Sequence, residues 1–242
     1  MRSETLRVFT PLFLGRMLRA IIFDCDGVIA DTEPIHMATF QRVLIEEGIT
    51  LSEDNYFREY LGLDDRACFT KAFAMLAVSL TVYRLNELIK RKADFVETAM
   101  RSSLKLLPGA AEFIQTAAER YPLAVASGAL RSEIELVLKC GGLRDCFQVI
   151  VSSEDVSRSK PDPAPFIKAL ELLNLSDGDP IQPRECLVIE DSIHGIEAAH
   201  RAAMPCLAVA NSYPRHKLSH AAKVIDSLAQ FHLEDAEDLV RA

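Results

Sequence analysis

Residues 21–31, which read IIFDCDGVIAD, constrain the fold of this chain more than any other stretch. The β-branched and aromatic residues 21–23 predict a buried strand, which ends at Asp24 and Asp26. Gly27 then permits a tight turn. In an open α/β sheet, ligands bind in the crevice beyond the carboxyl ends of the strands. The two carboxylates are therefore candidates for a nucleophile and a proton carrier that together hold a cation, and an acidic turn without a function is the alternative.

From residue 122 onward, short apolar runs alternate with segments of helical periodicity. The apolar runs end in small or acidic residues and read PLAVASG, QVIVSS, ECLVIEDS and PCLAVANS. The helical segments between them read SEIELVLKCGG, APFIKALELLN and GIEAAHRAAM. KVIDSL predicts a last short strand, and LEDAEDLVRA predicts a terminal helix. Because near-continuous apolar strands alternate with helices, the fold class predicted is α/β with a doubly wound parallel sheet.

Residues 32–106 contain no convincing strand and have helical patterns almost throughout. Thr32 is a candidate N-cap for the first of these helices. The predicted organisation has an N-terminal extension at 1–16 and an α/β core domain made of 17–31 and 107–242. An all-helical domain at 32–106 is inserted after the first strand.

Composition and charge limit the partners of the chain. The net charge of −8 argues against general nucleic-acid binding, and it means that a phosphate site needs local Lys, Arg or metal. No run approaches the roughly 20 apolar residues of a membrane-spanning helix, and the N-terminal run VFTPLFLG is short and lacks a cleavage site. The six cysteines form no CxxC or Cys/His zinc pattern, which predicts reduced thiols in a cytoplasmic protein. We expect a monomer, with an oligomer left open.

Polar residues also follow the later apolar runs. Ser127 lies in VASG, Lys160 in RSKPDP, and Glu190 and Asp191 in LVIEDS. Taken singly, these are ordinary features: a cap, a loop lysine and a helix N-cap. Together with DCDGVIADTE, the ordered set ASG, SKPDP and VIEDS resembles the four motifs of the haloacid dehalogenase superfamily of phosphotransferases. The resemblance extends from residue 18 to about residue 227.

The resemblance implies a mechanism. Asp24 would attack phosphorus and form an aspartyl-phosphate. Asp26 would protonate the leaving alcohol and then activate water for hydrolysis. Mg²⁺ would bind the carboxylate of Asp24, the main-chain carbonyl of Asp26 and the carboxylate of Asp191, with Glu190 as a further or an outer ligand. Hard oxygen ligands suit Mg²⁺ better than zinc.

The resemblance also implies a phosphate-binding set. The hydroxyl of Ser127 and backbone amides near Gly128 would bind phosphoryl oxygens, and Gly27 would lie beside the substrate. Lys160 would balance the carboxylates and keep Asp24 ionised.

The helical insert is similar to the small cap of the β-phosphoglucomutase-like branch, with DTEPIH and IKRKADF as the closest stretches. His36 and Lys92 fall on positions that the mutase uses near its acid/base Asp and its substrate. A helix-face position for His36 and a solvated face for Lys92 are the alternatives. Asp65 stands where the mutase has a phosphate-binding Arg, and Arg66 follows as a candidate substrate-binding residue. Residues 128–130, Gly-Ala-Leu, replace the polar residues of the mutase.

The function expected from this set is a Mg²⁺-dependent phosphatase of a small phosphorylated metabolite, with a sugar phosphate as the favoured substrate. A phosphosugar mutase that needs a bisphosphate activator is the first alternative. A non-catalytic relative that binds phospho-ligands is the second, and the presence of both Asp24 and Asp26 argues against it.

Overall fold

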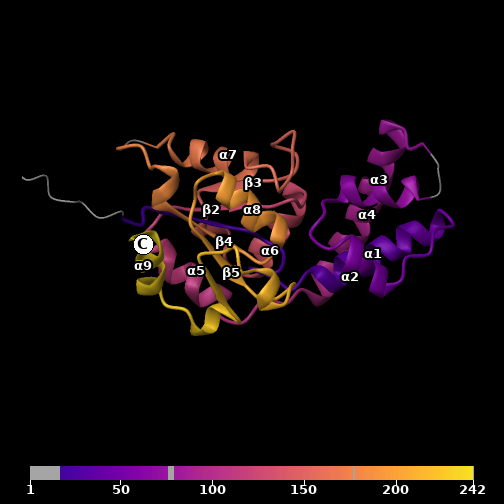
Figure 1. Cartoon of the computed structure of the whole chain (residues 1–242). Coiled ribbons are helices and arrows are strands. Elements are labelled where there is room, and N and C mark those ends of the chain that lie inside the picture. Colours follow the sequence, from indigo (N-terminus) through magenta and orange to yellow (C-terminus); the bar gives the residue numbers. More distant parts are fainter. Residues whose placement is uncertain (1–16, 76–78, 177, 242) are drawn as a thin grey trace, which may run out of the picture.

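The computed structural model describes residues 17–75, 79–176 and 178–241. A six-stranded parallel sheet forms its centre, with the strand order β3-β2-β1-β4-β5-β6. Figure 1 shows the sheet with helices around it. The strands are β1 (Ala20–Phe23), β2 (Leu123–Ala126), β3 (Val149–Val151), β4 (Cys186–Glu190), β5 (Cys206–Val209) and β6 (Lys223–Ile225). Each lies in an apolar run from which a strand was predicted, so the α/β fold class is confirmed.

The sheet has two apolar faces because strand side chains alternate in direction. On one face, Ile21 and Phe23 pack with α5 (Ala110–Ala118), α6 (Arg131–Cys140) and α9 (Leu233–Arg241). On the other, Ala20 and Ile22 pack with α7 (Ala164–Leu173) and α8 (Ile193–Arg201). Burial of both faces explains why the strands are apolar at nearly every position.

Strand β1 lies at the point where the strand order reverses. Phe23 pairs with Val125 of β2 on one side and with Ile189 of β4 on the other. The next amide, that of Asp24, donates to the carbonyl of Ile189 at 2.9 Å. Because a crevice opens at such a reversal, beyond the carboxyl ends of the strands, Asp24 is placed at the expected ligand site.

Four helices follow β1 and gather beyond the carboxyl edge of the sheet (Figure 1). They are α1 (Glu33–Glu46), α2 (Glu53–Glu59), α3 (Asp65–Ala74) and α4 (Val82–Ser103). They share an apolar core of their own, which includes Phe40, Phe69 and Leu88. The far end of α4, with Val96 and Met100, packs instead into the core of the sheet. The all-helical prediction for this part of the chain is thereby confirmed for its described residues.

Thr32 occupies the N-cap position of α1, as predicted, but its side chain does not cap the helix. Its hydroxyl donates instead to Oδ1 of Asp26 at 2.5 Å. The prediction therefore placed the start of α1 correctly, but the Thr32 hydroxyl binds Asp26 and not a backbone amide of the helix.

The cysteines, the helix lengths and the N-terminal extension were also subjects of sequence expectations. Each of the six cysteines is a free thiol. Within the described ranges, every helix is too short or too polar to cross a membrane. The extension predicted at 1–16 lies outside the described residues.

Candidate active site

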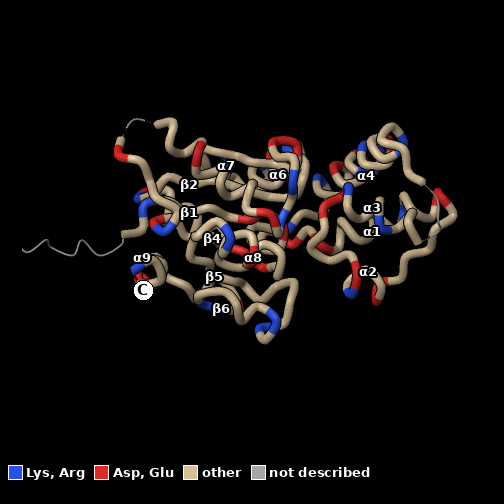
Figure 2. The backbone as a smooth tube through the Cα atoms, turned by 45° about the horizontal axis from the view of Figure 1, so that its top comes forward, with Lys and Arg blue, Asp and Glu red and all other residues tan. Residues whose placement is uncertain are grey.

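A cavity of about 920 Å³, its opening to solvent included, lies between the carboxyl edge of the sheet and the helices α1 to α3. Figure 2 shows Asp and Glu positions gathered at this junction. Of the predicted site residues, those that line the cavity are Asp24, Asp26, His36, Ser127, Gly128, Lys160 and Asp191. The topology thus joins residues that are far apart in the sequence.

Asp24 and Lys160 form a buried ion pair. Nζ of Lys160 donates to Oδ1 of Asp24 at 2.8 Å and to Oε1 of Glu190 at 2.6 Å. Burial lowers the pKa of Lys160, but the two carboxylates raise it above its usual value. Burial raises the pKa of Asp24, Lys160 lowers it, and the charges of Glu190 and Asp26 raise it, so that the result is about 7. Lys160 therefore offsets only part of the increase in the pKa of Asp24 that burial and the neighbouring carboxylates cause.

Glu190 is fully buried and has donors on both carboxylate oxygens. Oε1 accepts from Lys160, while Oε2 accepts from the amides of Asp191 and Ser192 at 3.0 Å and from the hydroxyl of Ser192 at 2.9 Å. A side chain at Gly195 would place its Cβ 1.8 Å from Cδ of Glu190. These contacts fix Glu190 as an organiser of the site, and Gly195 is a requirement that the sequence analysis missed.

The carboxylates of Asp24, Glu190 and Asp191 each offer an oxygen within 4.8 Å of the others. Three carboxylates and one Lys leave a formal charge of −2 when all are ionised. Burial, followed by the charges of Glu190 and Asp24, raises the pKa of Asp191 well above its usual value. Since both carboxylate oxygens of Glu190 already accept hydrogen bonds from the protein, Asp24 and Asp191 are the side chains best placed to bind a hard divalent cation. The residues fit Mg²⁺ in charge and in ligand type.

Gly27 supports Asp191 rather than lining the cavity. It has a φ of +73°, and a Cβ there would lie 1.9 Å from Oδ2 of Asp191. The same carboxylate oxygen accepts a short hydrogen bond from the hydroxyl of Ser212. Ser212 ends the apolar run PCLAVANS, but it was not identified as a site residue because it belongs to none of the four family motifs.

We expect Mg²⁺ to raise the Tm of metal-free protein, and by more at about pH 8 than at about pH 5. The pKa of Asp24 is about 7 in the folded protein against 3.8 as its ordinary value. Protonation of Asp24 therefore gives stability that is fully present below 3.8 and is lost as the pH rises through 7. Above that range, the carboxylates repel one another, and a divalent cation offsets the repulsion. Thermal unfolding with Mg²⁺ or EDTA at constant ionic strength measures the effect, and equal shifts at both pH values would contradict it.

Asp26 differs from Asp24 in its surroundings. Oδ1 lies 3.4 Å from Nε2 of His36 and accepts from Thr32, and the hydroxyl of Ser127 lies 3.4 Å from Oδ2. Burial raises the pKa of Asp26. His36, the Thr32 hydroxyl and the charge of Lys92 lower it by more than burial raises it, so the pKa is about 2. The two aspartates thus have pKa values on opposite sides of the ordinary value.

Lys92 is fully buried, so the solvated-face interpretation is wrong for this residue, although Lys90 in the same run is exposed. Its Nζ lies 2.9 Å from Nδ1 of His36 and 2.5 Å from Oδ1 of Asp65, and 4.5 Å from the centre of the Phe40 ring. His36 lies on a face of α1, but it is buried there between Lys92 and Asp26 and so has charged partners that the helix-face interpretation did not include.

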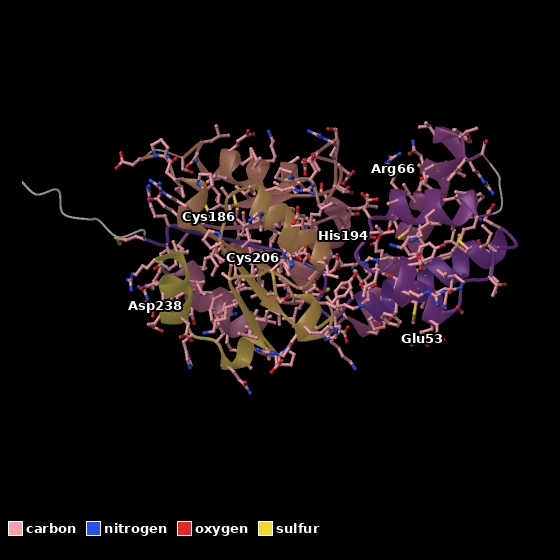
Figure 3. The ribbon with its side chains drawn as sticks, in the orientation of Figure 1. Glu53, Arg66, Cys186, His194, Cys206 and Asp238 are labelled. Atoms are coloured by element: carbon pink, nitrogen blue, oxygen red, sulfur yellow. The ribbon has the colours of Figure 1, made fainter. Side chains whose placement is uncertain are left out.

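Arg66 lies outside the cavity lining. It is exposed, and its Nη2 is 3.5 Å from Oδ1 of Asn86. Figure 3 shows Arg66 on the helical part of the molecule and His194 close to the junction with the α/β part. The neighbouring Asp65 points to the cavity instead, so a shift of one residue along the first turn of α3 decides which side chain reaches the site.

The loop between α2 and α3, residues 60–64, contacts three separate parts of the α/β core. The hydroxyl of Tyr213 donates to the carbonyl of Leu61 at 2.9 Å, and Nδ1 of His194 lies 3.4 Å from the carbonyl of Gly62. Asp64 accepts a short hydrogen bond from Ser159. These contacts, none of which the sequence analysis identified, hold the helical part over the cavity.

The sequence matches a family model described as "Haloacid dehalogenase-like hydrolase" over residues 21–209. It is 30% identical over 220 residues to "5-amino-6-(5-phospho-D-ribitylamino)uracil phosphatase, chloroplastic" from Arabidopsis thaliana, a match that covers 90% of this chain and 57% of that relative. The chain therefore spans little more than half of that relative's length. It is 31% identical over 191 residues to "Phosphorylated carbohydrates phosphatase" from Thermotoga maritima, covering 77% of this chain and 82% of the relative.

Among solved structures, β-phosphoglucomutase from Clostridium difficile superposes with a TM-score of 0.82 at 23% identity. The match covers 93% of this chain and 97% of that one. At this identity, the similarity shows a common fold, with the helical insertion included.

Proposed function

This chain belongs to the haloacid dehalogenase-like hydrolase family, and we propose that it is a Mg²⁺-dependent phosphatase of a small phosphorylated metabolite. The observation that carries the proposal is the buried pairing of Asp24 with Lys160 on the floor of a cavity that Asp26 and Asp191 also line. The similarity to the "Phosphorylated carbohydrates phosphatase" of Thermotoga maritima supports a phosphoric monoester hydrolase and a sugar phosphate as its substrate.

Asp24 is the proposed nucleophile. A carboxylate oxygen attacks phosphorus, the bond from phosphorus to the ester oxygen breaks, and an aspartyl-phosphate forms. A phosphate dianion repels this carboxylate, so catalysis depends on positioning and on charge neutralisation. Lys160 supplies one positive charge, and Mg²⁺ held by Asp24, the carbonyl of Asp26 and Asp191 would supply the rest.

Asp26 is the proposed acid and base. With a pKa of about 2, it is ionised in the free protein. A phosphate dianion bound beside it raises its pKa, because a neighbouring negative charge favours the neutral carboxyl. Asp26 then takes up a proton from solvent and transfers it to the leaving alkoxide, and the regenerated carboxylate takes a proton from the water that hydrolyses the aspartyl-phosphate. The hydroxyl of Ser127 and amides near Gly128 are proposed to bind the phosphoryl oxygens.

We place the cap domain at residues 32–106 and the catalytic core at 17–31 and 107–242. The contacts of the loop at 60–64 with Tyr213 and Ser159 support a cap that encloses the substrate and excludes water. The free thiols support a reducing compartment, and we propose a cytoplasmic location and a monomer.

The mutase alternative has weaker support. A mutase must hold a second phosphate in the cap, and the residue at the corresponding position is Asp65, which is paired with Lys92. A carboxylate repels a phosphate, and the pairing removes the free charge of Lys92. A binding protein without catalysis would have no use for the two differently tuned aspartates.

Phosphorus NMR of the purified protein with Mg²⁺ and a panel of sugar monophosphates tests the proposal. We expect inorganic phosphate to appear without a bisphosphate activator and to stop appearing when EDTA is added. Movement of phosphate between sugar positions only in the presence of a bisphosphate would establish a mutase instead. Binding without turnover across the panel would support the non-catalytic alternative.

A further inference from the structure

Three buried polar atoms that face the cavity have no hydrogen-bond partner within the described part of the chain. They are Oδ2 of Asp65, Oε1 of Glu133 and Nε2 of His36, which lies 3.4 Å from Oδ1 of Asp26 without forming a hydrogen bond to it. All three residues line the same cavity as Asp24. An unpaired polar atom in a buried site is unfavourable unless a ligand or water completes its hydrogen bonds. Two of the three atoms are carboxylate oxygens, which accept hydrogen bonds when ionised.

Glu133 is the most deeply buried of the three, with 4% of its surface exposed. It lies in the first turn of α6, where Oε2 accepts from the amide of Leu130 at 3.2 Å. The other oxygen remains for a ligand. Glu133 belongs to none of the motifs by which the family is identified, and neither the proposed mechanism nor the proposed phosphate site uses it.

The two carboxylate oxygens of Asp65 also differ, because only one of them has a hydrogen-bond partner. Oδ1 accepts from Lys92 at 2.5 Å, which fixes the side chain, and Oδ2 is free of protein donors among the residues described. Lys92 is also in contact with His36 and the ring of Phe40, so its charge is not available to an anion. Asp65 and Glu133 thus each keep one carboxylate oxygen without a protein donor among the described residues, and both line the cavity that Asp24 lines.

The charges around the cavity exclude a second anion. Among its described lining residues, Lys160 is the single Lys or Arg, and it is paired with Asp24 and Glu190. Arg131, which follows the Ser127 motif, turns to the carbonyl of Ile150 at 2.9 Å and to Asp155 at 2.7 Å. A phosphate or carboxylate at the far end of a substrate would therefore face the carboxylates of Asp65 and Glu133 without an unpaired Lys or Arg among the described lining residues to bind it.

We propose that Asp65 and Glu133 form a hydroxyl-accepting subsite, which selects monophosphates with a neutral, hydroxyl-rich organic part and rejects substrates with a second anionic group. Substrate hydroxyls donate to Oδ2 of Asp65 and Oε1 of Glu133 and complete their hydrogen bonds. The inference rests on the proposed phosphatase function and specifies its substrate class.

The test compares Glu133→Gln and Asp65→Asn with the wild type on three kinds of substrate in the presence of Mg²⁺. These are neutral sugar and alditol monophosphates, their acidic counterparts 6-phosphogluconate and fructose 1,6-bisphosphate, and p-nitrophenyl phosphate, which has no hydroxyl groups. We expect kcat/KM for the best neutral substrate to fall by about 10- to 100-fold in each variant. With p-nitrophenyl phosphate it should stay within about twofold, and the preference over the acidic substrates should shrink.

Matched controls separate this role from a structural one. Glu135→Gln makes the same change on α6 outside the cavity, and Asp54→Asn makes it on α2; both should behave as the wild type. Thermal unfolding checks each variant, and Glu133→Gln keeps the test decisive if Asp65→Asn destabilises the buried Lys92. Equal losses on all substrates, or wild-type turnover of the acidic substrates as fast as the neutral ones, would overturn the subsite alone. No turnover of any substrate, p-nitrophenyl phosphate included, would overturn the phosphatase and the subsite together.

Discussion

Replacement of Asp24 with Asn is expected to lower kcat by about 10⁴-fold or more while the protein remains folded. The amide is a poor nucleophile and cannot form the aspartyl-phosphate. The fold should survive because Asp24 lies beyond the end of β1, and its backbone hydrogen bond to Ile189 does not depend on the side chain. Removing one of three clustered carboxylates also relieves repulsion, so we expect a Tm equal to or above that of the metal-free wild type. Single-turnover kinetics and thermal unfolding measure the two effects.

The matched control for this variant is Asp31→Asn, an exposed carboxylate that follows the same strand and does not line the cavity. It should retain wild-type turnover. Turnover by Asp24→Asn at the rate of this control would eliminate Asp24 as the nucleophile. A large loss of Tm would instead mean that the side chain holds the site together.

Replacement of Lys160 with Met is expected to reduce both stability and activity. The side chains of Lys160 and Asp24 are 10% and 11% exposed, and that of Glu190 is 0% exposed. Removing the cation leaves two buried carboxylates without their partner, a change that costs about 3–5 kcal/mol in comparable buried pairs. Activity should fall by about 10³-fold, because the proposed nucleophile loses the cation that keeps it ionised and positioned. Chemical denaturation in EDTA and steady-state kinetics in Mg²⁺ give the two quantities.

The loss of stability in Lys160→Met should depend on pH. Lys160 lowers the pKa of Asp24, so its removal places the folded-state pKa further above the ordinary value of 3.8. A raised folded-state pKa gives stability that is present at low pH and is lost as the pH rises through that pKa. The stability difference from the wild type should therefore shrink as the pH falls. Lys168→Met on α7, where the side chain is 42% exposed, is the control, and a deficit independent of pH would contradict the assignment.

The fold and the main site residues could be predicted from the sequence because both depend on short stretches of residues. Near-continuous apolar runs identify strands buried on both faces, and the residues that follow them must lie at one edge of a parallel sheet. Asp24, Ser127 and Asp191 directly follow β1, β2 and β4 and line one cavity, whereas Lys160, which lies in the loop after β3, was placed with them by the resemblance to the family motifs. The roles of these residues in catalysis remain proposals, which the two variants above address.

The surroundings of these residues were less accessible, because they depend on contacts between elements distant in the sequence. The KRK run gives no sign that Lys92 is buried against His36 and Asp65, and the N-cap position of Thr32 gives none that its hydroxyl serves Asp26. Asp65 and Arg66 are adjacent, and only the orientation of α3 decides that the carboxylate faces the cavity.

The amino-acid sequence alone determined the α/β class, the helical insertion after the first strand and the set of acidic and basic residues at the sheet edge. These depend on hydrophobic periodicity and on residue order, which are properties of short stretches. The tertiary structure alone decided which charges are already paired, which oxygens remain free and how the pKa values of Asp24 and Asp26 diverge. Burial and through-space charge set these properties, and both are defined only once separate parts of the chain are packed together.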